Sequence, residues 1–559
     1  MTRWALISNT TVAPLAARLK TELHNTGQEC ELFVSQYSDV NQQILQPASQ
    51  LYSFRPDWLV LYLGLEQLRP NLEGTFAFEL PKQRSDIQDE IVAEVLALVR
   101  SVRANCGATL LVNNFPVVPR TVLGVGLDPV LKSAVRQMNL KLADELTSVP
   151  NCFLYDCDSL WAEVGWSDRD RRFEMLAQLP FGPKLQPLLV REWLRYFRAV
   201  QGQARKCVVV DLDNTLWGGI LGEDGPDKIQ MGDTPHGRPY RRLQQALQIL
   251  NRRGLLLAVC SKNNSSDVLA VLREHPDLLL REKDFAALQI NWQDKATNLC
   301  AIARELNIGL QHMVFLDDNP TERQWVRETL PEVLVPELPA DAALVADVLT
   351  NCELDTLALT EEDLKRTQMY VADRERKKFQ ATTPTYEQFL QELQLVVQIE
   401  RLQPSLLDRA VQLCQRTNQF NLTTQRYTSI DLQRMAAAPD TVVLLMNVRD
   451  RFGDYGWTGL AIAQHQTGRA IIDSFLVSCR VLGKQVEFAL FAAVVDWARQ
   501  AGCAELYATY HVTPKNAACA DFYSNCGLQA VAVQPQSYVR ALAELPAPPI
   551  GHIQLSVKR

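Results

Sequence analysis

The stretch KCVVVDLDNT, residues 206–215, indicates the fold class of the central part of the chain. Its apolar, β-branched run ends in Asp211 and Asp213, as expected where a strand covered on both faces of a parallel sheet reaches its carboxyl end. Side chains alternate along a strand, so Asp211 and Asp213 are expected on one face. One carboxylate can attack phosphorus while the other supplies a proton to the leaving oxygen and takes one from water. The stretch therefore predicts phosphoryl chemistry at a sheet edge.

Strands and helices alternate on the carboxyl side of this stretch. The periodicity predicts a helix over 240–254, a strand over 255–261, a helix over 294–308 and a strand over 312–319. This alternation favours an α/β unit with a parallel, Rossmann-like sheet.

Each later element of this unit carries a polar group where its strand ends or its helix begins. Ser261 ends LLLAVCS, Lys295 opens a helix, and Asp317 and Asp318 end HMVFLDD. A hydroxyl and an ammonium can hold phosphate oxygens as charge moves onto them. A single acidic pair could equally cap a helix, but four polar elements in register favour a catalytic centre.

Carboxylates that face an anionic phosphate require a hard cation, and Mg²⁺ suits a site made only of oxygen ligands. The predicted metal ligands are Asp211, Asp213, Asp317 and Asp318, and the predicted catalytic groups include Asp211, Asp213, Ser261 and Lys295. Thr215, Lys262 and Asn263 adjoin them and are predicted to bind substrate. Only 50 residues separate Asp211 from Ser261, so no large cap domain fits between them and an extended or protein-borne substrate could enter.

Composition limits the class of protein. The 559 residues carry a net charge of −7, with acids and bases mixed along the chain, which gives no sign of nucleic-acid binding or of a membrane anchor. No segment has the length and hydropathy of a signal peptide or a membrane span, so we expect a cytoplasmic protein. The thirteen cysteines form neither CxxC pairs nor Cys/His clusters, which gives no indication of a disulfide framework or a zinc site.

The central and C-terminal stretches resemble a known family. They resemble the FkbH family, in subfamily IIIC of the haloacid dehalogenase (HAD) superfamily, over VVVDLDNTLWGGILGEDG (208–225), RRGLLLAVCSKNN (252–264), INWQDKATNL (290–299), ELNIGLQHMVFLDDNPTERQWVRETLPEV (305–333), RTNQFNLTTQRY (416–427) and DSFLVSCRVLGKQVE (473–487). The resemblance implies a glyceryl transferase/phosphatase that loads the glyceryl group of 1,3-bisphosphoglycerate onto the phosphopantetheine of an acyl carrier protein in polyketide or related biosynthesis. It also implies that Asp211 is the nucleophile and Asp213 the acid/base.

The C-terminal part is similar to GNAT-type acyltransferases. The strand 470–479 runs into RVLGKQ (480–485), which resembles the Q/R-x-x-G-x-G/A turn that holds a pantetheine pyrophosphate on backbone N–H groups. The resemblance implies substrate contacts from Arg480 and Gly483, and from Asn516 and Tyr523 in KNAACADFYSNCGL (515–528). The alternative for Tyr523 is packing in the core. Gln485 departs from the small residue of the motif, which is compatible with a carrier-held pantetheine arm.

Two cysteines lie at strand ends beside these predicted sites. Cys260 adjoins Ser261 and Cys479 precedes the turn at Arg480, and a thiol pKa lowered by the neighbouring cation would make either one a nucleophile. The alternative for each is a small buried core residue. The amide-rich run RTNQFNLTT (416–424) either lines the acyl pocket or satisfies its own backbone.

The predicted fold class is multidomain α/β, with a C-terminal α+β domain. The predicted domains are 1–200, similar to a degenerate SGNH hydrolase without its catalytic groups; 201–345, HAD-like with a small or absent cap; 346–392, a helical linker; and 393–559, GNAT-like. Two other functions stay open, namely a stand-alone phosphatase of a small metabolite fused to an N-acetyltransferase, and a non-catalytic assembly protein.

Overall fold

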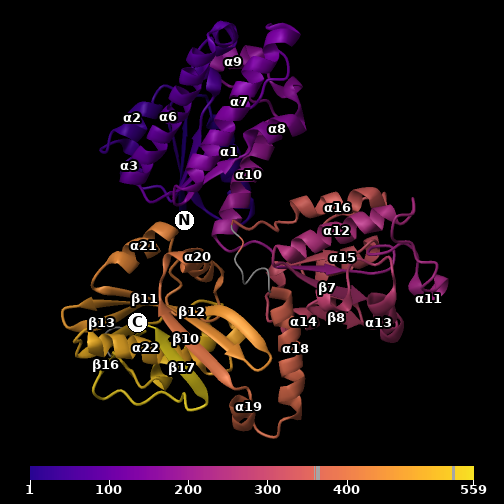
Figure 1. Ribbon diagram of the computed structural model, residues 1–559, viewed down its shortest axis with the longest axis vertical. Helices are drawn as coiled ribbons and strands as arrows, with labels where there is room; N and C mark the ends of the chain where they lie inside the picture. The colour runs from indigo at the N-terminus through magenta and orange to yellow at the C-terminus, as the bar shows by residue number, and fades with distance from the viewer. Residues whose placement is uncertain (358, 360–365, 532–535, 559) are drawn as a thin grey trace. The chain divides into compact units, whose positions relative to one another are not determined.

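A computed structural model describes residues 1–357, 359, 366–531 and 536–558. It divides into two compact units, Met1–Phe197 and Arg198–Arg559, which are described separately (Figure 1). The first unit holds one sheet, and the second unit holds two.

The first unit is built on a five-stranded parallel sheet of order β2-β1-β3-β4-β5. The strands are β1 (Thr2–Ser8), β2 (Cys30–Val34), β3 (Trp58–Tyr62), β4 (Thr109–Asn113) and β5 (Cys152–Tyr155). This order is a doubly wound arrangement, in which helices cover both faces of the sheet.

The helices of the first unit follow the strands in alternation. They are α1 (Ala13–Asn25), α2 (Val40–Leu45), α3 (Gln50–Phe54), α4 (Leu65–Leu68), α5 (Leu72–Thr75), α6 (Pro81–Asn105), α7 (Gly124–Thr147), α8 (Cys157–Val164), α9 (Arg171–Ala177) and α10 (Leu185–Val200), with short 3₁₀ turns η1 (Phe76–Phe78) and η2 (Trp166–Asp168). On one face Trp4 stacks on Trp58 at 5.0 Å between ring centroids, and Phe197 of α10 packs against both. Ala5 and Leu59 point the other way, into the core beneath α6 and α7.

The second unit begins with a four-stranded parallel sheet of order β8-β7-β6-β9. Its strands are β6 (Cys207–Val210), β7 (Leu256–Ser261), β8 (Ala287–Ile290) and β9 (Met313–Leu316). Its helices are α11 (Leu221–Asp224), α12 (Arg238–Arg252), α13 (Ser265–Glu274), α14 (Lys295–Leu306), α15 (Pro320–Thr329) and α16 (Val345–Val348), with the 3₁₀ turns η3 (Glu282–Asp284), η4 (Leu310–His312), η5 (Ala342–Leu344) and η6 (Leu349–Asn351).

This sheet is the middle of three layers, as the apolar strand sequences predict. Val208 and Val210 pack with residues of α12 and α13, whereas Cys207 and Val209 pack with residues of α14 and α15. Between β6 and α12 the chain forms only the short helix α11 and two isolated bridges, Asp213 with Trp217 and Gly218 with Gln230. The expectation of a small or absent cap is therefore confirmed.

Two helices lead from this sheet to the next one. They are α18 (Arg366–Thr382) and α19 (Tyr386–Glu392). The sequence predicted a helical linker over 346–392, and residues 358 and 360–365 of that range lie outside the described part of the chain. The Arg376 guanidinium of α18 forms a paired hydrogen bond with the Asp450 carboxylate, at 2.7 Å from Nε and 2.9 Å from Nη2, which fixes α18 to the last sheet.

The last sheet has eight strands of mixed direction, in the order β15-β16-β14-β13-β12-β11-β10-β17. The strands are β10 (Leu395–Arg401), β11 (Thr441–Asp450), β12 (Gly453–Gln466), β13 (Arg469–Val477), β14 (Glu505–Thr509), β15 (Gln529–Ala530), β16 (Ser537–Ala541) and β17 (Ile553–Lys558). The helices are α20 (Leu407–Arg416), α21 (Ser429–Ala437), α22 (Val486–Gln500) and α23 (Phe522–Asn525), with the 3₁₀ turns η7 (Pro404–Leu406), η8 (Cys479–Val481) and η9 (Ala517–Cys519). Helix α22 packs on one face, and α20 and α21 pack on the other.

The parallel strands β13 and β14 separate at their carboxyl ends. Their pairing stops at Ile472 and Ala508, although β13 continues to Val477. The segment 420–422 then pairs with the free end of β13, through N–H groups of Leu422 and Val477. Strand β13 thus ends beside the turn at residues 479–485, which leads into α22.

Candidate active site

A carboxylate–lysine centre forms where β6, β7 and β9 end together at one edge of the four-stranded sheet. Lys295 Nζ lies 2.6 Å from Asp211 Oδ1 and 3.1 Å from Asp317 Oδ2, and it donates to the backbone oxygen of Cys260 at 2.8 Å. The side chains of Lys295, Asp211 and Asp317 are 3%, 11% and 1% exposed. Because parallel strands place their carboxyl ends at one edge, residues more than a hundred positions apart converge here.

Three of these carboxylates could share one cation. One oxygen each of Asp211, Asp317 and Asp318 lies within 4.8 Å of the others. Asp211 and Asp317 are buried and Asp318 faces solvent, so the group opens to the outside on one side. An oxygen-only set of this size suits Mg²⁺.

The charged groups at this centre shift one another's pKa values. Burial raises the pKa of Asp211 to about 6, with Lys295 opposing the rise and Asp317 adding to it. Burial alone would lower the pKa of Lys295, but the two carboxylates raise it above its usual value. The pKa of Asp318 is raised by burial and by Asp317. An additional positive charge is therefore favoured among these carboxylates.

Asp213 stands apart from this metal-binding group, which corrects the prediction that its carboxylate is a metal ligand. Its Oδ1 accepts hydrogen bonds from Trp217 Nε1 at 2.9 Å and from the Leu221 backbone N–H at 3.1 Å. Its Oδ2 accepts one from Asn263 Nδ2 at 2.9 Å. These donors hold the carboxylate in place, so its position suits the predicted acid/base role better than metal binding.

The neighbouring polar side chains are held around the centre. Thr215 Oγ1 lies 3.2 Å from Asp318 Oδ1 and accepts the Asp318 backbone N–H at 3.0 Å. Ser261 is buried at the end of β7, and a hydrogen bond between its side chain and Asp211 lowers the pKa of that carboxyl. The ammonium of Lys262 instead pairs with Glu322 at 2.5 Å, which places it at the rim rather than over the carboxylates.

Cys260 is not a nucleophile in this structure, which corrects the prediction of a lowered thiol pKa. The residue is fully buried and its Sγ lies 3.9 Å from the backbone oxygen of Lys295. Burial raises the pKa of Cys260 to about 12, and the nearby Lys295 only partly opposes the rise. The side chain therefore serves as a small core residue of the sheet.

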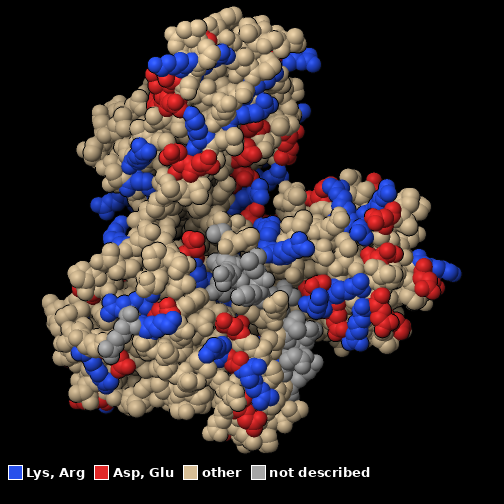
Figure 2. Space-filling model, in the orientation of Figure 1, with Lys and Arg blue, Asp and Glu red and all other residues tan. Residues whose placement is uncertain are grey.

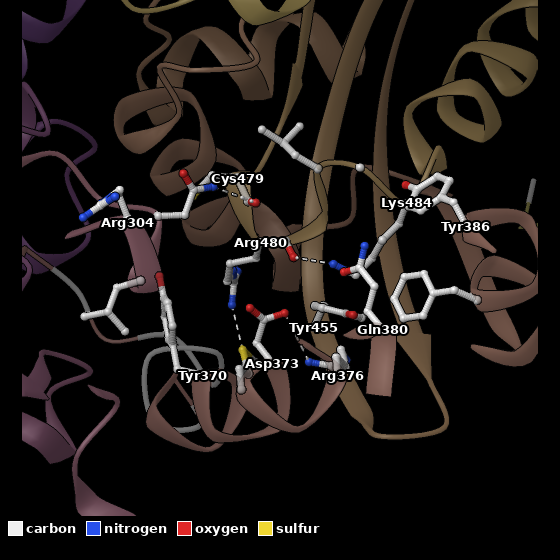
Figure 3. A pocket seen from close by; sticks show the side chains of 16 residues that line it. Arg304, Tyr370, Asp373, Arg376, Gln380, Tyr386, Tyr455, Cys479, Arg480 and Lys484 are labelled. Carbon is white, nitrogen blue, oxygen red and sulfur yellow. Dashed lines mark hydrogen bonds and ion pairs between the residues drawn. The ribbon is translucent and has the colours of Figure 1, made fainter. Parts of the chain in front are cut away.

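A second candidate site is a cavity of about 450 Å³, here called the transfer cavity (Figure 3). Cys479, Arg480 and Gly483 line it from the turn before α22, as the sequence predicted for one site. The same turn contributes Lys484. The other lining residues come from α14, α18, α19 and β12, and include Arg304, Tyr370, Asp373, Arg376, Gln380, Tyr386 and Tyr455. Figure 3 shows the Arg480 side chain pointing from the turn toward α18, where its Nη1 contacts Met369 Sδ.

The turn that lines the transfer cavity has an unusual backbone. Gly483 has a φ of 78°, and Gln485, the residue before α22, has a φ of 62°. The left-handed region costs roughly 1–2 kcal/mol for a residue with a side chain. The chain thus keeps the turn conformation even though Gln485 replaces the small residue of the motif.

Two predicted substrate contacts lie away from the transfer cavity. Asn516 is fully buried, and its side chain donates to the backbone oxygens of Asn421 and His511, both at 2.8 Å. Tyr523 is fully buried in the core beside Tyr538, and burial raises its pKa well above the usual value. Both predictions are corrected, because these side chains stabilise the fold.

The amide-rich run 416–424 also satisfies its own backbone. The side chain of Asn421 donates to the Thr417 backbone oxygen at 3.2 Å and accepts the Thr424 N–H at 2.8 Å. The sequence left open whether this run lines the acyl pocket or hydrogen-bonds its own backbone. The contacts of Asn421 agree with the second alternative. Asn418 instead lines a separate cavity with Cys479.

Sequence reasoning missed several residues of both sites. Trp217 lies four positions after Asp213 in the motif itself, so its spacing was the available signal. Arg304, Arg376 and Lys484 belong to segments far apart in the chain. Only their packing brings them to the transfer cavity.

Known families match two parts of the chain. The model described as FkbH, N-terminal domain, matches residues 3–192, and the model of the GNAT acetyltransferase family matches residues 448–528. The N-terminal part of protein BF1531 from Bacteroides fragilis, containing a phosphatase domain complexed with Mg, is 31% identical, covers 64% of this chain and 95% of its own, and has a TM-score of 0.58. The ribosomal-protein-S18-alanine N-acetyltransferase from Escherichia coli is 16% identical, covers 28% of this chain and 96% of its own, and has a TM-score of 0.21. The comparison with curated proteins gave no significant match.

The fold and the two sites define a protein in which a HAD phosphatase-like domain is joined to a GNAT acyltransferase-like domain. Within that class, the chain belongs to the FkbH family.

The surface and the helices add two observations. On the face drawn in Figure 2, acidic and basic side chains are interspersed over both units. Among the helices of the described residues, none combines the length and hydropathy needed to cross a lipid bilayer.

Proposed function

We propose that this protein is a bifunctional glyceryl transferase/phosphatase that uses 1,3-bisphosphoglycerate to load a glyceryl thioester onto an acyl carrier protein. The observation that carries the proposal is the presence of two different sites in one unit. One is a buried carboxylate–lysine centre, and the other is a cavity in which a thiol lies beside a pantetheine-type turn.

The phosphatase step belongs to the carboxylate–lysine centre. Asp211 attacks the phosphorus of the phosphate monoester, and the ester oxygen leaves with the electron pair of the P–O bond and a proton from Asp213. Asp213 then takes a proton from the water that hydrolyses the aspartyl phosphate. In this proposal Lys295 and Ser261, which both contact Asp211, hold the phosphoryl oxygens.

Mg²⁺ fits the same centre. The oxygens of Asp211, Asp317 and Asp318 lie close enough for a shared ion, and the relative from Bacteroides fragilis holds Mg in its phosphatase domain. When bound, the ion neutralises the charge of the phosphoryl group. Lys295 keeps Asp211 oriented by their ion pair.

The transfer step belongs to the transfer cavity. The pantetheine arm of the carrier enters beside Arg480 and Gly483, and a thiolate attacks the acyl carbon of the donor. The carbon–oxygen bond to phosphate breaks, inorganic phosphate leaves with the electron pair, and the thiol proton passes to it or to solvent. Cys479 is the enzyme thiol at this position and can carry the acyl group before the carrier receives it.

The proposal is tested by intact-mass spectrometry of a phosphopantetheinylated carrier protein incubated with the enzyme, Mg²⁺ and 1,3-bisphosphoglycerate. Wild type is expected to add a glyceryl mass, and Asp211→Asn is expected to leave a phosphoglyceryl mass instead. Cys479→Ala should abolish loading but keep hydrolysis of a small aryl phosphate. Cys300→Ala, another half-buried cysteine, is the control.

A second candidate is a stand-alone phosphatase fused to an N-acetyltransferase, which the GNAT family match over residues 448–528 favours. It predicts phosphate release without any carrier and consumption of acetyl-CoA. No mass gain on several carriers, together with these two activities, would replace the first proposal by the second.

A further inference from the structure

A separate cavity of about 370 Å³, here called the basic cavity, adjoins the transfer cavity within the second unit. Its lining includes five cations, namely Lys206, Arg409, Arg416, Arg480 and Lys515. Among the described residues that line it, none is Asp or Glu. A concave surface of one charge sign concentrates ligands of the opposite sign.

Cations act on the other side chains of the basic cavity. The pKa of His312, which lines it, is lowered to about 3 by burial and then by Lys206, Lys515 and Arg205. The Arg409 guanidinium is buried, and it donates to the backbone oxygen of Trp457 at 3.0 Å and 2.6 Å. Such an environment disfavours a further proton and favours an anion.

The basic cavity and the transfer cavity meet at four shared residues, which are Asn307, Tyr370, Cys479 and Arg480. Asn307 Nδ2 donates to the Cys479 backbone oxygen at 3.4 Å, so two of the shared residues are hydrogen-bonded to each other. Because Cys479 lines both cavities, a ligand anchored in the basic cavity can extend its other end toward this residue.

We propose that the basic cavity binds the terminal phosphate monoester of the acyl-phosphate donor and directs its acyl carbon to Cys479. This inference rests on the proposed function and adds the donor site, which lies outside the carboxylate–lysine centre. The two ends of 1,3-bisphosphoglycerate differ chemically. Its phosphate monoester suits the basic cavity, and its reactive acyl phosphate then lies at Cys479, where the transfer cavity begins.

The order of the two reactions follows from this anchoring. The monoester must stay intact while it holds the donor, so acyl transfer comes first. A thioester forms, the carbon–oxygen bond to the acyl phosphate breaks, and one inorganic phosphate leaves. The carboxylate–lysine centre then hydrolyses the monoester of the phosphoglyceryl thioester.

The test is the binding of 2,3-bisphosphoglycerate, which carries phosphate monoesters but cannot acylate, to the full chain by isothermal titration calorimetry. An Asp211→Asn background prevents hydrolysis. Lys515 is exposed at the cavity mouth, so Lys515→Glu should fold normally. It is expected to weaken binding by at least about tenfold, because a charge-assisted contact becomes a repulsion. Lys228→Glu, another exposed lysine, should leave binding unchanged.

A competition experiment distinguishes the phosphate of the donor from the phosphate of the pantetheine arm. Phosphopantetheine should bind without displacing 2,3-bisphosphoglycerate, since its phosphate is expected at the pantetheine-type turn. Displacement, or equal affinity of Lys515→Glu and its control, would overturn the inference.

Carrier loading distinguishes failure of this inference from failure of the proposed function. If wild type loads no carrier, the proposed function fails. If it loads carriers and Lys515→Glu keeps the same KM for the donor, only the basic-cavity inference fails.

Discussion

Among the described residues, Lys295 is the cation that forms ion pairs with the two buried carboxylates of the carboxylate–lysine centre. It is 3% exposed and forms ion pairs with Asp211 and Asp317. Removing one partner of a buried ion pair leaves an uncompensated charge, which costs about 3–5 kcal/mol. We therefore expect Lys295→Met to lower the free energy of unfolding by about that amount in EDTA, measured by urea denaturation.

Added Mg²⁺ should recover part of this loss, because a cation among Asp211, Asp317 and Asp318 replaces the missing charge. Lys228→Met, at an exposed position, should behave like wild type. Equal stability of Lys295→Met and wild type in EDTA would show that the pairs contribute nothing.

His312 makes stability depend on pH. Burial and nearby cations lower its pKa from 6.5 to about 3. Between these values the unfolded chain takes up a proton that the folded chain does not, so the free energy of unfolding falls as the pH falls. The slope from this residue is at most about 1.4 kcal/mol per pH unit. His312→Asn should flatten the decline between pH 6.5 and pH 4, measured by urea denaturation at several pH values, and an unchanged slope would contradict this account.

At the scale of elements, a buried ion pair holds α18 against the eight-stranded sheet. Arg376 and Asp450 are 3% and 0% exposed, and the Tyr455 hydroxyl also donates to Asp450 at 2.8 Å. Arg376→Ala leaves the buried Asp450 carboxylate without its cation, so we expect the free energy of unfolding to fall by about 3–5 kcal/mol. The double variant Arg376→Gln, Asp450→Asn should lose less than the single change, measured by thermal unfolding. Additive losses would show that the two side chains do not interact.

Because α18 also lines the transfer cavity, Arg376→Ala should impair carrier loading more than hydrolysis of a small aryl phosphate. The carboxylate–lysine centre is built from β6, β7, β9 and α14, none of which contains Arg376.

At the scale of the whole molecule, we expect the two compact units to unfold in separate transitions, because each has its own core. Residues 1–200 include all of α10, whose Phe197 completes the aromatic cluster with Trp4 and Trp58. We expect this fragment to fold alone and the full chain to show at least two calorimetric transitions. Mg²⁺ at 100 times its Kd should stabilise only the second unit, by about 2.7 kcal/mol. One cooperative transition that Mg²⁺ shifts as a whole would contradict this expectation.

The sequence determined the class of the folds and the order of polar groups in the carboxylate–lysine centre. Strand periodicity is local information, and the carboxyl ends of neighbouring parallel strands must share one edge. Asp211, Ser261, Lys295 and Asp317 could therefore be placed together from their positions at strand and helix ends. Their roles in catalysis stay predictions.

Only the tertiary structure decided which of several similar residues face a cavity. The sequence predicted both Cys260 and Cys479 at strand ends beside a site, but the structure buries Cys260 and leaves Cys479 at the junction of two cavities. Tyr523 fits a motif and lies in the core. The basic cavity combines side chains from position 206 to position 515. Burial and electrostatic potential arise from packing between segments far apart in the chain, and neither spacing nor periodicity encodes that packing.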